Sequence, residues 1–152
     1  MLSRKSTQLK KQTPRRVNEQ NEVTSEKSLM QSLDHGIDWR EKGAVNPIVD
    51  QGLCGSGWAF ATVATLESAH FIRNGELLSL STQQIVDCTL QGEYGNSGCD
   101  GGWARRSFMY SDKHPIQLES DYPYTSGVTE VESSTCSHSE VKGKVSAGGF
   151  SA

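Results

Sequence analysis

The four cysteines are the most chemically versatile residues of the sequence, since a thiol attacks carbonyl groups, binds metal ions or forms disulfides. They are Cys54, Cys88, Cys99 and Cys136, in a chain of 152 residues. None of them forms a CxxC motif, and Cys136 with His138 supplies only two ligands, so we expect no metal site and no cofactor. An even number of widely spaced cysteines instead predicts two disulfides, with three connectivities open.

The first cysteine begins the stretch CGSGWAF, which predicts a short loop entering a helix over about residues 57–73. Large apolar residues recur there at three- and four-residue spacing, and alanines between them allow close packing on several sides. The pair Asn74-Gly75 ends the helix, because both residues tolerate the left-handed conformation of a C-cap. We expect a central, largely buried helix, a pattern that by itself indicates no chemistry.

A second, short helix is predicted from Ser81 to about Cys88, because STQQ is a capping box. The Ser81 hydroxyl is expected to accept the backbone N–H of Gln84, and the Gln84 side chain to reach back to the N–H of Ser81. Beyond it the sequence indicates the following elements: a loop over 90–102, a helix over about 103–113, an irregular stretch over 115–135 and one strand over 141–150.

The first 36 residues are polar and differ in charge from the rest. Residues 1–16 hold six basic side chains and no acid, within a chain of net charge −3. We interpret them as a disordered, solvated arm rather than a nucleic-acid or membrane-surface ligand or a mitochondrial transit peptide. No apolar run approaches the ~20 residues of a membrane span, and the N-terminus lacks the apolar segment of a secretory signal.

Four motifs occur in an order that resembles the papain-like cysteine peptidase family: DWREKGAVNPIVDQGLCGSGWAF, LSLSTQQIVDC, GCDGG and DYPYTSG. The resemblance covers about residues 37–150. It implies the α+β papain-like fold, of which the chain is expected to hold largely the helical first domain and at most the beginning of the β second domain. The expected division is therefore a basic arm over 1–36 and a truncated first domain over 37–152.

The resemblance also assigns roles along the substrate cleft. Gln51 matches the glutamine whose side-chain amide donates to the oxyanion. Gly101 and Gly102 match glycines that let a substrate backbone lie against the cleft wall. Trp103 resembles the start of the wall of the main specificity pocket, and the alternative for it is core packing in the third helix.

For the cysteines, the resemblance implies the pairs Cys54–Cys99 and Cys88–Cys136. Each bridge would close a loop of more than 40 residues and contribute about 4 kcal/mol in the chain-entropy model. Disulfides indicate an oxidising compartment. The family points to a lysosomal, vacuolar or secreted protein, although the sequence shows no signal peptide.

The catalytic groups of the family are not matched. Its signature C-G-[SA]-C-[WY] requires cysteine where this chain has Gly57. Ser56 cannot replace it, because one residue earlier points about 100° away around the helix. No histidine of the chain lies in the family's second-half motif; the four are His35, His70, His114 and His138.

The sequence therefore predicts a papain-like homologue without peptidase activity. Two alternatives stay open: a peptide-binding or regulatory pseudopeptidase, whose partner is an extended peptide or a complementary peptidase-like domain, and a fragment of a longer gene of the family. No nucleic-acid partner and no membrane span are expected.

Overall fold

The computed structural model describes residues 36–133, 135–139 and 142–148. The chain divides into two compact units, Met1–Ile37 and Asp38–Ala152, and the second is described below. The polar arm expected over 1–36 lies outside the described residues except for Gly36.

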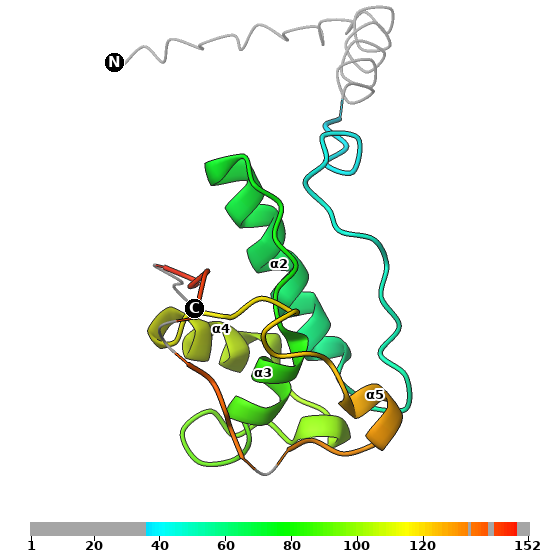
Figure 1. Ribbon diagram of the computed structural model, residues 1–152, viewed down its shortest axis with the longest axis vertical. Helices are drawn as coiled ribbons and strands as arrows, with labels where there is room; N and C mark the ends of the chain where they lie inside the picture. Colours follow the sequence, from blue (N-terminus) through cyan, green and yellow to red (C-terminus); the bar gives the residue numbers. More distant parts are fainter. Residues whose placement is uncertain (1–35, 134, 140–141, 149–152) are drawn as a thin grey trace, which may run out of the picture. The chain divides into compact units, whose positions relative to one another are not determined.

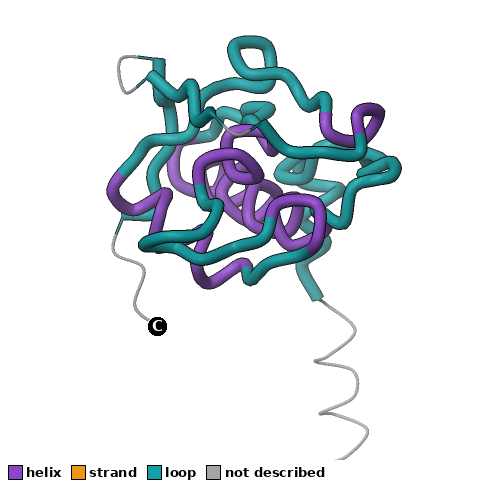
Figure 2. The backbone as a smooth tube through the Cα atoms, turned by 90° about the horizontal axis from the view of Figure 1, so that it is seen from below, coloured by secondary structure: helices purple, strands orange, loops and turns teal. Residues whose placement is uncertain are grey.

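The second unit is helical, and its described residues contain no strand (Figures 1 and 2). Helices gather at its centre and loops surround them (Figure 2). The long helix α2 contacts both α3 and α4, and α3 contacts η1. The elements are α2 (Gly57–Asn74), α3 (Thr82–Cys88), the 3-10 helix η1 (Gly98–Asp100), α4 (Ala104–Lys113) and α5 (Ser126–Thr129). This is the helical architecture expected for the first papain-like domain.

Helix α2 lies at the centre of the core, as its apolar spacing predicts. The expectation that it is largely buried is wrong, because one face packs inward and the rest stays accessible; the buried residues are Ala59, Thr62, Val63, Leu66 and Glu67. It ends at Gly75, which takes the left-handed conformation (φ 77°) and donates its N–H to Phe71 O at 2.7 Å. Its inward face packs against residues from α3, α4 and the segments that follow them. The buried hydrophobic cluster consists of Ala59, Val63, Leu66, Leu80, Ile85, Val86, Tyr110, Ile116 and Val145.

Helix α3 begins with half of the predicted capping box. Ser81 Oγ accepts the backbone N–H of Gln84 at 3.0 Å, as expected. The prediction of the reciprocal bond is wrong: the N–H of Ser81 donates to Gln117 O at 2.9 Å and not to the Gln84 side chain. The buried Gln84 amide instead donates to Tyr110 Oη and Pro115 O and accepts from Gln117 N. A distant segment therefore replaces the local partner.

Two further predictions differ from the structure. The prediction of a strand over 141–150 is wrong for residues 142–148, the part that the structure describes. There, Val145 forms only an isolated antiparallel bridge with Ile116. Pro115, which precedes Ile116, has no N–H with which to extend that pairing. The stretch over 115–135 also contains the short helix α5, which the sequence analysis missed. Its four residues are too few for a periodic signal.

The described residues also include no helix that is both long and apolar enough to cross a membrane.

Candidate functional site

The loop before α2 is held in place by the segment that contains α5. Gly52 has a φ of 63° and donates its N–H to Asp50 Oδ1 at 2.9 Å, while Leu53 N donates to Gly127 O at 3.0 Å. A Cβ atom on Gly52 would lie 2.3 Å from Gly127 O. Glycine is therefore required at position 52 by both its conformation and the approach of another backbone.

The serine before the helix points into the protein. Ser56 is fully buried, its Oγ lies 2.6 Å from Tyr124 Oη, and Tyr124 donates its own hydroxyl proton to Gln51 O at 2.8 Å. Ser56 makes no side-chain hydrogen bond to the start of α2, and the first turn contains no acid. The positive end of the α2 dipole is thus neither capped by its serine nor offset by an acid.

The structure brings Gln51 and position 57 together. Gly57 is exposed, and an ideal Cβ atom built on it lies 3.0 Å from Gln51 Oε1. A side chain at position 57 would therefore begin beside the amide of Gln51, at the positive end of α2. Because Oε1 accepts and Nε2 donates, the amide must turn over to present a donor there.

The two glycines before α4 have different surroundings. A Cβ atom on Gly102 would lie 2.7 Å from the ring of Trp58, whose Nε1 donates to Gly98 O at 3.3 Å. Gly101 has a φ of 115°, and its Cβ would meet nothing within 4 Å, so its backbone borders open space. Trp103 is 69% exposed, so it does not pack in the core. An accessible backbone and an exposed indole therefore lie side by side.

Both expected disulfides are present. Cys54 pairs with Cys99 and Cys88 pairs with Cys136, with S–S distances of 2.11 and 2.03 Å. The first bridge ties the loop before α2 to η1, where Gly55 N also donates to Cys99 O at 2.9 Å. All four thiols are therefore consumed in the oxidised chain.

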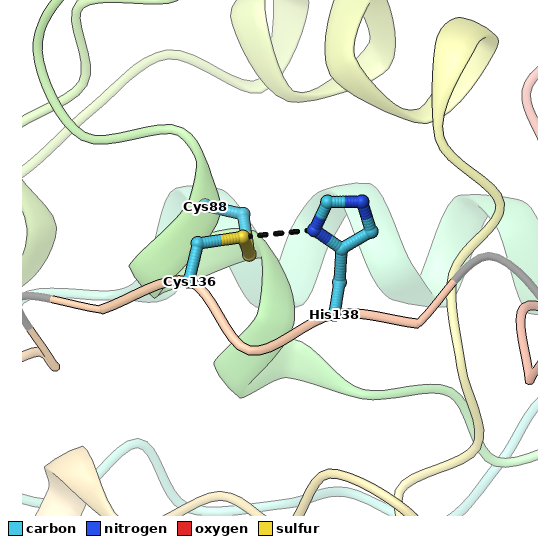
Figure 3. Close-up of side chains that lie close together, drawn as sticks. All are labelled: Cys88, Cys136 and His138. Atoms are coloured by element: carbon cyan, nitrogen blue, oxygen red, sulfur yellow. Dashed lines mark hydrogen bonds between the residues drawn. A yellow bond between two sulfur atoms is a disulfide. The ribbon is translucent and has the colours of Figure 1, made fainter.

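The histidines lie in three different settings, and His35 is outside the described residues. His70 lies on α2, where its Nδ1 is 2.9 Å from Asn74 Nδ2. His114 is the C-cap of α4, as its position before a proline predicts. His138 Nδ1 lies 3.0 Å from Cys136 Sγ (Figure 3). The two-residue spacing of Cys136 and His138 is visible in the sequence, and the disulfide adds Cys88 as a third member of the group.

Two carboxyl groups, the buried Glu67 and the half-buried Glu119, went unnoticed in the sequence. Glu67 and Glu119 line a cavity of about 330 Å³ between α2 and the segment 45–49. Glu67 Oε1 accepts the N–H of Leu80 at 2.8 Å, and Glu119 Oε1 accepts that of Tyr124 at 2.7 Å. Burial raises the pKa of both side chains, since desolvation penalises their charged form. Single glutamates within mixed segments gave no signal for this arrangement.

Comparison with known proteins gives one consistent result. The family model for "Papain family cysteine protease" matches residues 33–151. Digestive cysteine proteinase 1 of Homarus americanus is 50% identical over 101 residues, which cover 66% of this chain and 30% of that protein.

Solved structures show the same similarity. Procathepsin L 3 of the Tenebrio molitor larval midgut matches with a TM-score of 0.65 at 37% identity, over 74% of this chain and 34% of the other. Bromelain protease of Ananas comosus matches with a TM-score of 0.63 at 36% identity, over 72% and 47%. The chain spans 27–30% of the lengths of the three Homarus americanus proteinases that it matches. Sequence motifs, helical fold and both disulfides agree with these matches, and the chain belongs to the papain family of cysteine proteases.

Proposed function

We propose that this chain is a papain-family homologue that does not cleave peptides by a thiol mechanism, because Gly57 stands at the position of the nucleophile. The observation that carries this proposal is the 3.0 Å separation between a Cβ atom at position 57 and Gln51 Oε1. In the family signature a cysteine occupies this position, at a helix N-terminus that favours the thiolate. Glycine supplies no atom that can attack a carbonyl carbon.

No neighbouring group among the described residues supports a replacement nucleophile. Cys54, three residues earlier, is 1% exposed and bonded to Cys99. The Ser56 hydroxyl is buried against Tyr124. In this proposal Gln51 remains in place as an oxyanion donor. Without a nucleophile, an oxyanion donor gives only a small fraction of the catalysis of the intact site.

A second candidate function, peptide binding, is supported by the surface before α4. Gly101 borders open space, and the adjacent Trp103 exposes 69% of its surface. The N–H of Gly101 donates to Gly98 O at 3.3 Å and its carbonyl oxygen accepts the N–H of Ser97 at 2.9 Å. In this proposal an extended peptide therefore lies across the open side of Gly101, and one of its side chains contacts the indole as an exposed aromatic anchor. A complementary peptidase-like domain is the other partner that this surface would accept.

The compartment follows from the disulfides. Two bridges in one small unit are stable in an oxidising environment. We therefore propose a secreted, lysosomal or vacuolar location, in keeping with relatives named as digestive proteinases and cathepsins.

Hydrolysis of a dipeptidyl fluorogenic substrate, measured on the full chain with a mild thiol present, tests the first proposal. We expect no release of fluorophore above that of a buffer blank. Hydrolysis that is abolished by a thiol alkylator would overturn the proposal. The binding candidate is tested with a library of extended peptides and the variant Trp103→Ala: peptides that bind both forms equally would contradict it.

A further inference from the structure

Away from position 57, a second group of chemically active side chains lies between α3 and the segment 135–139. The two sulfur atoms of Cys88 and Cys136 lie beside the imidazole of His138 (Figure 3). The donor atoms of these three residues are all within 4.8 Å of one another. In the described part of the chain, this is the one group of three histidine, cysteine or acidic side chains close enough to share a metal ion.

We propose that reduction of the Cys88–Cys136 disulfide turns this cluster into a binding site for a zinc-like divalent cation. Two thiolates and one imidazole are donors that Zn²⁺ prefers, and a water molecule completes four-coordination at sites with three protein ligands. This site is separate from the function proposed above, because none of its members belongs to the loop before α2.

The chemistry balances with a dithiol as reductant. The dithiol supplies two electrons and two protons, its own sulfurs join in a cyclic disulfide, and the bond between Cys88 and Cys136 opens to two thiols. The cation then displaces both thiol protons to the buffer and binds two thiolates and the neutral imidazole of His138. For the reverse step, a small-molecule disulfide accepts the two electrons and leaves as two thiolates, while the sulfurs of Cys88 and Cys136 rejoin and the cation is released.

The geometry requires small movements. In a tetrahedral zinc site the two sulfurs would lie roughly 3.8 Å apart and each sulfur roughly 3.5 Å from the nitrogen, given the usual bond lengths. The sulfurs start 2.03 Å apart, and His138 Nδ1 starts 3.0 Å from Cys136 Sγ. Side-chain rotations at the two cysteines supply the required separation once the disulfide is open.

Hydrogen bonds keep the two cysteines close even without the disulfide. Asp87, next to Cys88 on α3, accepts the N–H of Ser133 at 2.7 Å and the hydroxyl of Tyr122 at 2.8 Å. Tyr122 Oη also accepts the N–H of Ser137, next to Cys136, at 3.4 Å. Besides the disulfide, the segment around Cys136 is therefore held beside α3 directly through Ser133 and, by a longer contact, through Ser137 and Tyr122.

The histidine is oriented by its ring contacts. The imidazole of His138 packs against the ring of His114 at a centroid distance of 5.1 Å and against Tyr110 at 6.1 Å. These contacts fix the plane of the ring while its Nδ1 faces the sulfur.

Cobalt titration tests the proposal on the full chain. After reduction by a dithiol under nitrogen, we expect one equivalent of Co²⁺ to produce the near-ultraviolet absorption of cobalt–thiolate bonds, and Zn²⁺ to displace it. The oxidised chain is the matched control and should show no such band. Cys136→Ser should abolish the band, and His138→Ala should weaken Zn²⁺ binding at least about tenfold.

The pair Cys54–Cys99 provides an internal comparison, since the double variant Cys54→Ser/Cys99→Ser keeps all three ligands. This variant should retain the cobalt band. Three results would overturn the proposal: no band in the reduced wild-type chain, equal binding by the His138→Ala variant, or a reduced chain that loses its helical circular dichroism and does not regain it with one equivalent of Zn²⁺.

Discussion

The starts of helices α2 and α3 are built in opposite ways, although a buried serine precedes each of them. At α3, Ser81 Oγ accepts the N–H of Gln84 and donates to Tyr122 O at 2.6 Å. At α2, the Ser56 hydroxyl turns away to Tyr124, and the helix begins with the exposed Gly57. The protein therefore satisfies one helix start internally and leaves the other open.

The difference separates a structural from a functional role. A cap pairs one of the free N–H groups of a helix start and contributes stability, whereas an uncapped and exposed start attracts anions and stabilises thiolates. The open start of α2 is also the one that has Gln51 beside it. The structure thus places an exposed, uncapped helix start beside Gln51, with glycine as the first residue of the helix.

The largest effect is expected at the loop that holds this open start in place. Gly52→Ala places a Cβ atom 2.3 Å from Gly127 O in a left-handed conformation, and we expect it to lower the free energy of unfolding by about 2–3 kcal/mol. Urea denaturation followed by circular dichroism measures this loss. Gly75→Ala, also left-handed but with nothing within 4 Å, is the control and should cost about 1 kcal/mol. Equal losses would show that the contact with Gly127 is unimportant.

The two serines allow a direct contrast between the helix starts. Ser81→Ala removes a cap and leaves buried partners unsatisfied, so it should cost about 1–2 kcal/mol. Ser56→Ala removes the hydrogen bond of Ser56 Oγ to Tyr124 and its longer contact with Cys54 O, while Tyr124 keeps its bond to Gln51 O, so about 0.5–1 kcal/mol should be lost. The same urea experiment compares them. A larger loss at Ser56 would reverse the assignment of α3 as the capped helix.

The connection between the two helices predicts a pH dependence. Glu67 of α2 accepts the N–H of Leu80, directly before Ser81, and its pKa is raised by burial. The folded state therefore holds the proton more tightly than the unfolded state, and stability falls as pH rises from the ordinary value of 4.5 through the raised pKa.

We accordingly expect the urea midpoint to increase when the pH is lowered from 7 to about 5. Glu119, whose pKa is raised in the same way, adds to the effect. Glu67→Gln should reduce this dependence, whereas Glu41→Gln, an exposed exchange, should leave it unchanged. A midpoint that rises with pH in the wild-type chain would contradict the sign.

The smallest effect is expected at position 57 itself. Gly57→Ala adds a methyl group at an exposed helix start, where its one close neighbour is the flexible end of Gln51. We expect stability to increase by about 0.5 kcal/mol, since alanine restricts the unfolded chain. A loss of more than about 1 kcal/mol would mean that the fold requires glycine at position 57. It would contradict the view that glycine here replaces a functional residue.

Sequence patterns predicted those features that depend on neighbouring residues. The bounds of α2 follow from its apolar period and its Asn74-Gly75 ending, and the Ser81 cap follows from a local motif. Contacts with distant segments account for the errors. The backbone oxygen of Gln117 accepts the N–H of Ser81, which the Gln84 side chain was expected to bind. The predicted strand lacks a neighbouring strand, and only the isolated bridge between Val145 and Ile116 forms.

For the site, the motifs predicted the disulfide pairs because each cysteine has a counterpart in the family. They could not show that the Ser56 hydroxyl is turned inward or that Trp103 is exposed, since both depend on packing against residues far along the chain. The cluster at His138 was missed although the family pairing places Cys88 beside Cys136, two residues from His138. That the imidazole lies beside the sulfurs depends on its packing against His114 and Tyr110.

The most direct test of the account is alkylation of a thiol placed at position 57. Iodoacetamide is added to the wild-type chain, to Gly57→Cys and to Ile48→Cys, without reductant, and adducts are counted by mass spectrometry between pH 5 and 8. Ile48→Cys is the reference because position 48 is fully exposed and lies outside any helix.

We expect no adduct on the wild-type chain, whose four cysteines are paired, and a single adduct on each variant. The Gly57→Cys thiol should react at a lower pH than the Ile48→Cys thiol, because the start of α2 stabilises its thiolate. An adduct on the oxidised wild-type chain, or a Gly57→Cys thiol that titrates like the reference, would contradict the claim that position 57 is the site of a missing nucleophile.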